Sequence, residues 1–403
     1  MQCRYCGADT KLLCELNPIP LTAGYRKEPD GAADRYPLRL MGCSCGYVGL
    51  DHVINPYLLY PNNEELVAQS ASATQHLTGY AESLAATLSQ GSTVLDIGSN
   101  DGTFLSVFKK RGHLVLGIEP SIYAKAAAER LGIQTLSCFF DDDLVEFTRD
   151  WSKYDLVTAS RVWSNMLDSV ACLGHVKDLL LPEGRFIIET GYLPNILEKM
   201  LVETIYHEHI SYDMVQPMQQ LCREHGMVVT HVDYVPIKGG SIRLTIRHEG
   251  AADDTVGRAC ERETRWLTSM PWQRFQTHLM AEEAGLAEEI CKGGIVCGYG
   301  AGVPGTALIF QLGLEDKLSW VVDEQERYWG TYVPGTNLEI RGPDSLDESD
   351  QCVILAHRYA DQIKAKHPEY KAWAIPFQDT AMRSSKVTYH LSEHFGSVSM
   401  KIL

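Results

Sequence analysis

A glycine-containing turn between a short apolar run and a helix-forming segment constrains the fold of this chain more than any other feature. The stretch TVLDIGSNDGTFL occupies residues 93–105, with apolar residues before Gly98 and a polar turn that ends at Gly102. Glycine lets a backbone approach a ligand closely, and a strand, turn and helix in this order place the turn at the carboxyl edge of a sheet. The sequence therefore predicts a ligand-binding turn.

An acidic residue at the end of the next expected strand extends this prediction. Residues 113–118 are mostly apolar, with His113 at the start, and are followed by Glu119. A carboxylate about 20 positions after such a turn can accept hydrogen bonds from ribose hydroxyls. The turn is not G-x-G-x-x-G, and it carries Asn100 and Asp101, of which the acidic residue would repel a phosphate. A nucleoside with a positively charged tail fits better, which favours S-adenosylmethionine (SAM); an ordinary turn in another α/β protein is the alternative.

Strands and helices are expected to alternate from residue 91 to about residue 190. This order predicts a parallel sheet with right-handed crossovers, and hence an α/β fold. Two later segments alternate like strands and should form an antiparallel edge, at 228–234 and 241–247. The expected strands of the alternating region are 93–97, 114–118, 133–137, 155–159 and 185–189, and the expected helices are 102–111, 121–131, 141–149 and 169–179.

Residues at the ends of the third and fourth strands should face the ligand crevice. Phe140 follows the third strand and could flank an adenine ring, although a core position is an equal alternative. Ser160 begins the tip of the fourth strand, which continues through Arg161 to Asn165. Upstream, Tyr60 could reach the same site or serve in packing.

A second unusual stretch is ETIYHEHISY at residues 203–212. Histidine suits general acid–base catalysis near neutral pH, and a neighbouring carboxylate fixes its tautomer and raises its basicity. H-E-H lacks the H-E-x-x-H spacing and no third ligand is evident, so a metal site is not predicted there. Apolar residues are interleaved with the polar ones, which favours a partly buried site over a polar surface.

The first 70 residues carry a pattern of cysteines that is typical of a structural zinc site. Two close pairs, C-x-x-C and C-x-C, are each followed by glycine, and four thiolates suit tetrahedral zinc. Such a small segment cannot bury enough apolar surface to be stable without metal. Cys14 and His52 are spare candidates, and four unconnected thiols are the alternative. The predicted ligands are Cys3, Cys6, Cys43 and Cys45.

Composition limits the classes of partner. The 403 residues include 45% hydrophobic and 22% charged side chains, which is typical of a globular protein with two or three domains. A formal net charge of −16 argues against nucleic acid and anionic membrane surfaces as partners. No apolar run approaches a membrane span and the N-terminus does not resemble a signal peptide, so a cytoplasmic protein with reduced cysteines is expected.

A second glycine-rich turn lies near the C-terminus, in GYGAGVPG at residues 298–305. It is followed by an expected strand that ends at Asp323, so it is similar to a nucleotide-binding turn, with tight helix–strand packing as the alternative.

Taken together, these segments resemble the SAM-dependent sugar C-methyltransferases, which act on thymidine-diphosphate 4-keto sugars in deoxysugar pathways. The resemblance spans essentially the whole chain and is most specific in LDIGSNDGTFL, ETIYHEHISY, GGSIR and VPGTNLEI. It implies three parts: a zinc-binding module (1–70), a class I Rossmann-like SAM domain (71–250) and a C-terminal α/β domain (251–403) that helps to bind the nucleotide.

The resemblance also implies roles for individual residues. Asp96, Gly98, Asn100 and Glu119 match SAM contacts, and Tyr206, Glu208 and His209 match the active-site motif, in which the last histidine is the base. A ketone acidifies the neighbouring C–H, so His209 would remove that proton and the enolate carbon would take the methyl group. The other predicted cofactor contacts are Asp101, Phe140 and Ser160, and the predicted substrate contacts are Tyr60, Arg161, Asn165, Lys238 and Tyr299.

Three departures from the family pattern lie on the acceptor side. Arg161 and Asn165 replace the usual asparagine and histidine of the fourth strand tip, and Lys238 replaces a histidine before GGS. Thr306 ends a C-terminal turn that lacks the usual lysine. The leading hypothesis is a C-methyltransferase for a nucleotide-linked keto sugar. A SAM-dependent enzyme for a non-sugar, anionic carbonyl compound and a non-catalytic SAM-fold binding protein are the alternatives.

Overall fold

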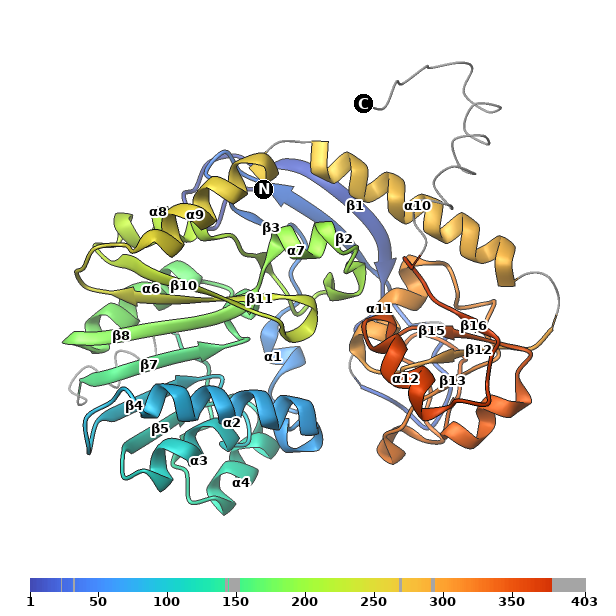
Figure 1. Ribbon diagram of the computed structural model, residues 1–403, viewed down its shortest axis with the longest axis horizontal. Coiled ribbons are helices and arrows are strands. Elements are labelled where there is room, and N and C mark those ends of the chain that lie inside the picture. Colours follow the sequence, from blue (N-terminus) through green and yellow to red (C-terminus); the bar gives the residue numbers. More distant parts are fainter. Residues whose placement is uncertain are drawn as a thin grey trace. The chain divides into compact units, whose positions relative to one another are not determined.

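The computed structural model describes residues 1–22, 24–31, 33–141, 144, 153–267, 270–290 and 294–378 (Figure 1). These residues form two compact units that alternate along the chain. The first unit comprises residues 1–12, 40–195 and 207–267, and the second comprises 13–39, 196–206 and 268–403. The expected division into three consecutive parts remains a prediction, whereas the two units are built from interleaved segments.

A seven-stranded sheet forms the centre of the first unit, in the order β10-β11-β8-β7-β4-β5-β6. The five strands from β8 to β6 run parallel, whereas β11 pairs antiparallel with both β8 and β10. The predicted parallel sheet with an antiparallel edge is therefore confirmed. The strands are β4 (Thr93–Ile97), β5 (Leu114–Ile118), β6 (Thr135–Leu136), β7 (Tyr154–Ser160), β8 (Leu180–Gly191), β10 (Val228–Val235) and β11 (Ser241–Arg247).

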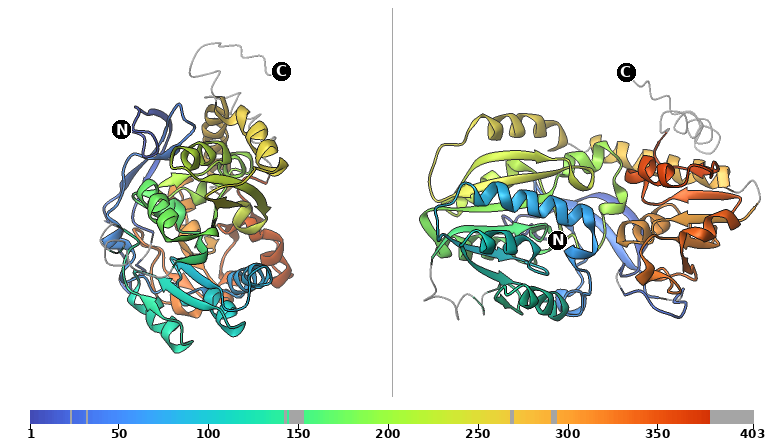
Figure 2. Two further views of the ribbon diagram at one scale, coloured as in Figure 1. Left: turned by 90° about the vertical axis from the view of Figure 1, so that its left-hand side faces the viewer. Right: turned by 60° about the horizontal axis from the view of Figure 1, so that its bottom comes forward.

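Helices cover both faces of this sheet (Figures 1 and 2). Val94 packs into a core with α2 and α3, while its neighbour Leu95 packs into the opposite core with α6 and α8. Because successive strand residues point to opposite faces, a strand buried on both faces is apolar at nearly every position. The helices are α2 (Ala71–Ala85), α3 (Thr103–Lys110), α4 (Ile122–Arg130), α6 (Ser169–Leu179), α8 (Val215–Glu224) and α9 (Asp254–Glu263).

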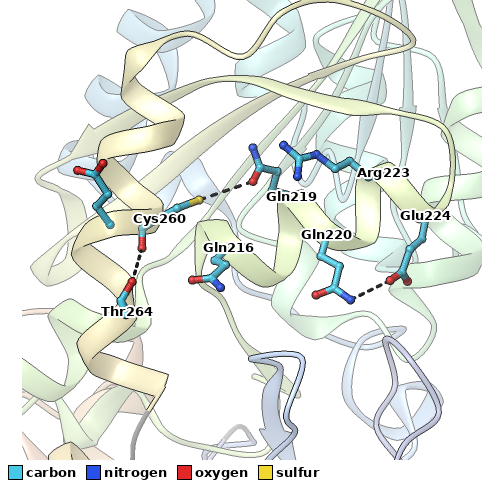
Figure 3. A pocket seen from close by; sticks show the side chains of 8 residues that line it. Gln216, Gln219, Gln220, Arg223, Glu224, Cys260 and Thr264 are labelled. Atoms are coloured by element: carbon cyan, nitrogen blue, oxygen red, sulfur yellow. Dashed lines mark hydrogen bonds between the residues drawn. The ribbon is translucent and has the colours of Figure 1, made fainter.

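Most predicted boundaries in this region lie within a few residues of the observed ones. The expected strand 133–137 shortens to the two residues of β6, and β8 begins five residues before the expected 185. The expected helix 141–149 lies almost entirely outside the described residues. A polar groove between α8 and α9 is lined by residues that include Gln216 and Arg223, and it contains none of the predicted site residues (Figure 3).

A small second sheet has the order β1-β2-β3-β9. The strand β3 pairs antiparallel with β2 and with the two-residue β9. In the sequence, β9 begins two residues after the H-E-H motif. The elements are β1 (Lys11–Ile19), β2 (Tyr36–Gly42), β3 (Val48–Leu50) and β9 (Ser211–Tyr212), with the short helices α1 (Pro56–Leu59), η1 (Val67–Gln69), η2 (Trp163–Asn165), η3 (Val202–Thr204), η4 (Ile237–Gly239), η5 (Thr264–Leu267) and α7 (Leu193–Glu198).

The second unit is built on a five-stranded parallel sheet in the order β14-β13-β12-β15-β16. The predicted strand, glycine-rich turn and helix are β12 (Val296–Tyr299) and α11 (Val303–Gln311). No helix among the described residues is long and apolar enough to cross a membrane. The remaining elements are α10 (Met270–Ile290), β13 (Trp320–Val322), η6 (Glu326–Tyr328), β14 (Ile340–Arg341), η7 (Pro343–Glu348), β15 (Gln351–Ile354), η8 (His357–Tyr359), α12 (Ala360–Lys366) and β16 (Trp373–Ala374).

Candidate active site and metal-binding cluster

The turn after β4 has a backbone conformation that requires glycine. Gly98 has φ of 71°, and a Cβ atom there would lie 2.9 Å from the Cβ of Val162. Asn100, in the same turn, has φ of 47°. Non-glycine residues with positive φ cost free energy and concentrate at functional sites. Arg161 and Lys238, with φ of 64° and 47°, share this property, so three predicted site residues have strained backbone.

Substitution of Gly98 by alanine is expected to lower the free energy of unfolding by about 1–3 kcal/mol, because a Cβ atom is strained at this φ and meets Val162. Chemical denaturation measures the change. Gly79 is the matched control, since it is exposed in α2 and a Cβ there meets nothing within 4 Å. Gly79→Ala should raise stability by up to about 1 kcal/mol. Equal stability of the two variants would contradict the strained turn.

Two buried carboxylates lie beside this turn. The Glu119 carboxylate accepts hydrogen bonds from the backbone N–H of Asn100 at 3.0 Å and of Ser121 at 2.8 Å. Asp96 accepts one from the Thr158 hydroxyl at 2.6 Å. Burial raises the pKa of Asp96 to about 7, with a smaller contribution from Glu119, whose own pKa burial also raises. A bound cation would favour the ionised forms of both groups.

The side chains of Asn100 and Asp101 hold a segment that the sequence did not assign to the site. The Asn100 side chain accepts from the backbone N–H of Val67 at 2.9 Å and donates to the carbonyl of Glu65 at 2.9 Å. Asp101 accepts from the N–H of Ala68 at 2.8 Å. Residues 65–68 therefore lie over the turn, and the polar run that contains them was the available sequence signal. Cofactor contacts of Asn100 and Asp101 remain predictions.

Aromatic residues gather near the end of β6. Phe139 contacts Tyr57, with ring centroids 4.5 Å apart, and lies 6.4 Å from the ring of Tyr60. Phe140 instead packs against the apolar core and lies edge-on to His175 at 6.2 Å. The structure thus places Phe139, rather than Phe140, beside the predicted substrate contact Tyr60.

The tip of β7 is tied to neighbouring strands through its backbone. The N–H of Arg161 donates to the carbonyl of Glu189 on β8 at 2.7 Å. The carbonyl of Ser164 accepts from the N–H of Ile210 at 2.6 Å, and the Ser164 hydroxyl donates to the Asn165 side chain at 2.9 Å. The predicted site residue Arg161 is therefore bonded to β8, and Asn165 lies beside Ser164, which contacts the segment that follows H-E-H.

A buried ion cluster, which the sequence did not reveal, lies at the same edge of the sheet. Glu189 is fully buried, and its two oxygens contact Arg243 Nε at 2.6 Å and His76 Nε2 at 2.8 Å. The Arg243 guanidinium also stacks on the ring of Tyr80 at 3.5 Å. Burial would raise the pKa of Glu189, but the hydrogen bond from His76 and the charge of Arg243 outweigh it and lower that pKa. Arg243 ends the GGSIR segment, which was the available signal.

Glu208, the central residue of the H-E-H motif, has a perturbed carboxyl group and a backbone contact to Tyr60. Burial, reinforced by the nearby charge of Glu65, raises the pKa of Glu208 to about 7, while Lys238 opposes the shift. The carbonyl of Glu208 accepts from the Tyr60 hydroxyl at 3.4 Å. The structure therefore joins Tyr60 to the backbone of Glu208, while the charges of Glu65 and Lys238 act on the Glu208 carboxyl group.

The histidines of the motif differ in burial. His207 is buried and lies edge-on to His52, with ring centroids 6.3 Å apart, whereas His209 is half-buried. Tyr206 is the last residue of the 196–206 segment, which belongs to the second unit. In that segment, buried Glu203 contacts Arg358 Nε at 3.0 Å and His357 Nε2 at 3.1 Å, an ion cluster that sequence reasoning missed.

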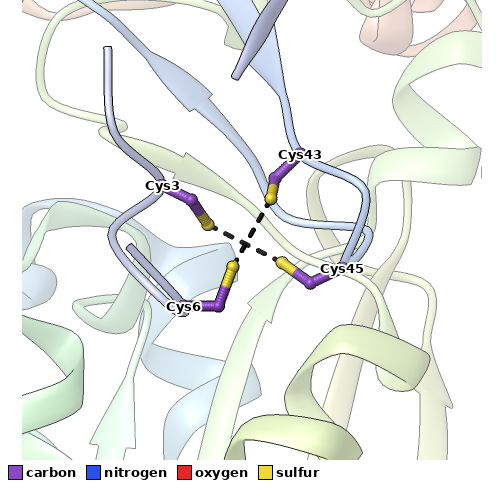
Figure 4. A group of neighbouring side chains, drawn as sticks. All are labelled: Cys3, Cys6, Cys43 and Cys45. Carbon is purple, nitrogen blue, oxygen red and sulfur yellow. Dashed lines mark hydrogen bonds between the residues drawn. The ribbon is translucent and has the colours of Figure 1, made fainter. Parts of the chain in front are cut away.

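The four predicted cysteines converge on one point (Figure 4). Their sulfurs all lie within 4.8 Å of one another, and the Cys3–Cys45 and Cys6–Cys43 pairs are 3.6 and 3.5 Å apart. Four sulfurs at about 2.3 Å from a tetrahedral zinc would be separated by about 3.8 Å, so this donor set fits the metal. Cys14 and His52, the spare candidates, are not part of the cluster.

The remaining predicted site residue, Tyr299, lies in the second unit. Its hydroxyl donates to Glu324 at 2.9 Å and lies 2.9 Å from His367 Nε2. Asp323, at the end of β13, accepts from the backbone N–H of Ala301 at 2.8 Å, which repeats the contact that Glu119 makes with the turn of the first unit. Whether Tyr299 binds substrate is not tested by this arrangement and stays a prediction.

Two family models match consecutive parts of this chain. Residues 74–232 match a family model described as a methyltransferase domain, and residues 236–378 match one described as a C-methyltransferase C-terminal domain. The chain is 27% identical over 389 residues to the C-methyltransferase NovU of Streptomyces niveus, and the alignment covers 92% of each chain. The chain is a SAM-dependent C-methyltransferase.

Solved methyltransferase structures align with part of this C-methyltransferase. The magnesium protoporphyrin IX methyltransferase of Synechocystis PCC 6803 with bound S-adenosylhomocysteine (SAH) has a TM-score of 0.35 and 17% identity, covering 43% of this chain and 82% of that chain. A possible histamine N-methyltransferase from Thermotoga maritima has a TM-score of 0.34 and 15% identity, covering 44% and 89%. The predicted class I methyltransferase fold is confirmed by the methyltransferase model that matches residues 74–232 and by the order of the seven-stranded sheet.

Proposed function

We propose that this enzyme transfers a methyl group from SAM to the carbon next to a ketone in a nucleotide-activated keto-deoxysugar. The observation that carries the proposal is that residues 60–67 contact both regions. The Tyr60 hydroxyl donates to the Glu208 carbonyl at 3.4 Å, and the Asn100 side chain binds the backbone of Glu65 and Val67. The acid–base motif and the expected cofactor turn are thereby neighbours. The similarity to a C-methyltransferase over 92% of the chain supports the choice of carbon as the methylated atom.

In the proposed mechanism, His209 removes a proton from the carbon beside the ketone, and that C–H electron pair becomes an enolate. Tyr206 donates a hydrogen bond to the enolate oxygen, and Glu208 orients His209. Held by the turn after β4 and by Glu119, SAM would supply the methyl group to the enolate carbon, keep the methyl–sulfur electron pair and leave as SAH. Protonated His209 then returns its proton to solvent.

The cofactor and substrate contacts are part of the same proposal. Asp96 and Glu119 would lie nearest to the positively charged and ribose parts of SAM, together with Gly98, Asn100, Asp101, Phe140 and Ser160. Zinc would be held by Cys3, Cys6, Cys43 and Cys45. Tyr60, Arg161, Asn165, Lys238 and Tyr299 would contact the acceptor.

The rate of methyl transfer is expected to rise with pH between about 6 and 8. Glu208 has a pKa of about 7, and only its ionised form raises the basicity of His209. The deprotonated form is the active one, so kcat should increase as pH increases through this value. In Glu208→Gln, kcat at pH 8 should fall, because the carboxylate that raises the basicity of His209 is gone. A wild-type profile that stays flat from pH 6 to 8 would contradict the role of Glu208.

Two titrations test the function. Calorimetry with SAH, and then with thymidine diphosphate, should give binding of both ligands. Binding of both justifies assays with thymidine-diphosphate keto sugars. Failure of SAH to bind would contradict the proposed cofactor site around residues 93–119.

A second candidate acceptor is an anionic, non-sugar carbonyl compound. Arg161, with its strained backbone at the tip of β7, favours it, since the family pattern has no arginine at this position. Binding of SAH without binding of thymidine diphosphate would support this candidate.

A further inference from the structure

The cysteine loops (residues 3–6 and 43–45) and the catalytic segment (residues 207–213, which include Glu208 and His209) are connected through one small sheet. β3 begins three residues after Cys45, and β9 begins two residues after His209. The two strands pair antiparallel, with Val48 opposite Tyr212 and Gly49 opposite Ser211. The N–H of Leu50 also donates to the carbonyl of Ile210 at 2.9 Å.

Tyr5 provides a second connection from the cysteine loops. It lies between Cys3 and Cys6, and its ring packs against Tyr47 at 4.6 Å. Its hydroxyl accepts a hydrogen bond from Trp163 Nε1 at 3.3 Å and lies 3.3 Å from Asp213 Oδ1, to which it donates. The Met218 sulfur, at 3.1 Å, is a weaker acceptor for the same proton. Tyr5 thus joins the first cysteine pair to the tip of β7.

Asp213 ends the catalytic segment and is buried. Besides Tyr5, it accepts hydrogen bonds from the hydroxyls of Thr190 at 2.7 Å and Ser211 at 3.3 Å. Its backbone carbonyl accepts from the N–H of Leu193 at 3.0 Å, just beyond the end of β8. A buried carboxylate depends on such donors, so each of them restrains the position of residues 207–213.

We propose that Tyr5 is a positioning residue through which the metal-bound cysteine loops hold residues 207–213 in place at the carboxyl edge of the main sheet. The inference rests on the proposed function only in taking Glu208 and His209 to be catalytic. The cysteine cluster then does more than stabilise its own loops, since β3 holds residues 210–212 and Tyr5 holds Asp213, directly after His209. Loss of the metal would release both restraints.

Tyr5→Phe tests the inference in the full-length, zinc-loaded protein, with Tyr47→Phe as the matched control. Tyr47 belongs to the same loops and packs on Tyr5, but its hydroxyl accepts from Arg4 at 2.8 Å. Hydrogen exchange followed by mass spectrometry should show faster exchange in residues 207–213 of Tyr5→Phe only. Both variants should retain zinc, measured by colorimetric release, and the wild-type Kd for SAH.

Kinetics provide a second readout. With a thymidine-diphosphate keto-sugar acceptor, kcat of Tyr5→Phe should fall about tenfold while KM for SAM is unchanged, because one hydrogen bond that positions the base is lost. Removal of zinc from the wild-type protein by a chelator should speed hydrogen exchange in residues 43–50 and 207–213 but not in β4 or β7. This measurement needs no substitution, so it tests the inference even if a variant folds poorly.

Wild-type exchange and kcat in Tyr5→Phe would overturn the inference. So would loss of zinc from that variant, or equal effects of the two substitutions. The exchange result does not depend on chemistry, so it separates this inference from the proposed function. If His209→Asn remains active while Tyr5→Phe still loosens residues 207–213, the catalytic assignment fails and the structural connection stands.

Discussion

Replacement of His209 by asparagine is expected to lower kcat by about 10²–10⁴-fold, the usual contribution of general acid–base catalysis. Asparagine approximates the shape of the imidazole but cannot take up a proton, so the C–H of the acceptor would remain intact. The Kd for SAH, measured by calorimetry, should not change, because Asp96 and Glu119 lie in the other part of the site. Transfer of labelled methyl from SAM to a keto-sugar acceptor measures the rate.

His248→Asn serves as the control for this experiment, since His248 follows β11 and lies outside the H-E-H motif. It should leave kcat at the wild-type value. Undiminished turnover in His209→Asn would refute the assignment of the base. Glu208 would then be the next candidate, because a carboxyl group with a pKa of about 7 is itself suited to accept a proton near neutral pH.

Arg243→Leu is expected to lower the free energy of unfolding by about 3–5 kcal/mol, the range found when one partner of a buried ion pair is removed. Glu189 is fully buried, and Arg243 donates to it at 2.6 Å. Without the guanidinium, the carboxylate keeps its contact with His76 Nε2 at 2.8 Å but loses the permanent cation that donates to it. Urea denaturation at pH 7 measures the loss. Arg247→Leu is the control, since Arg247 lies on the same strand and donates to a backbone carbonyl, that of Glu183, at 3.0 Å.

The effect of Arg243→Leu should depend on pH. The folded protein holds the pKa of Glu189 below its ordinary value of 4.5, so the stabilisation is present above that value and is lost as pH falls through the lower, folded-state pKa. The difference between wild type and variant should therefore be largest near neutral pH and shrink in acid. A difference below about 1 kcal/mol at pH 7, similar to a surface pair, would contradict a buried ion cluster.

Local patterns in the sequence were sufficient to predict much of the fold. The strand before Gly98 and the strand before Glu119 were placed correctly, because a strand buried on both faces is apolar throughout and ends in turn residues. The four-cysteine cluster was also predicted, since two close pairs of one ligand type leave few other arrangements. These features depend on residues that are near one another in sequence.

Contacts between distant segments could not be predicted in this way. Nothing in the turn around Asn100 indicates that its side chain holds the backbone of Glu65 and Val67, since an amide can face a ligand or the protein equally well. The pairing of Arg243 with Glu189 depends on the antiparallel register of β11 and β8, which alternation alone does not fix. These two contacts occupy the side chains of Asn100, Arg243 and Glu189, which a ligand could otherwise use. Local patterns therefore predict the fold better than they predict the site.

The interleaving of the two units has a consequence for how the chain is made. The chain passes between units after residues 12, 39, 195, 206 and 267, so no single cut releases either unit whole. β3 cannot pair with β9 until β9 has been synthesised, and β9 lies about 160 residues later in the chain. A ribosome needs roughly 8–30 s to add that many residues. During that interval the cysteine loops emerge without the strand that completes their sheet. Early metal capture would order the cysteine loops through their ligand bonds, although the edge of β3 that pairs with β9 stays open until residues 211–212 are made.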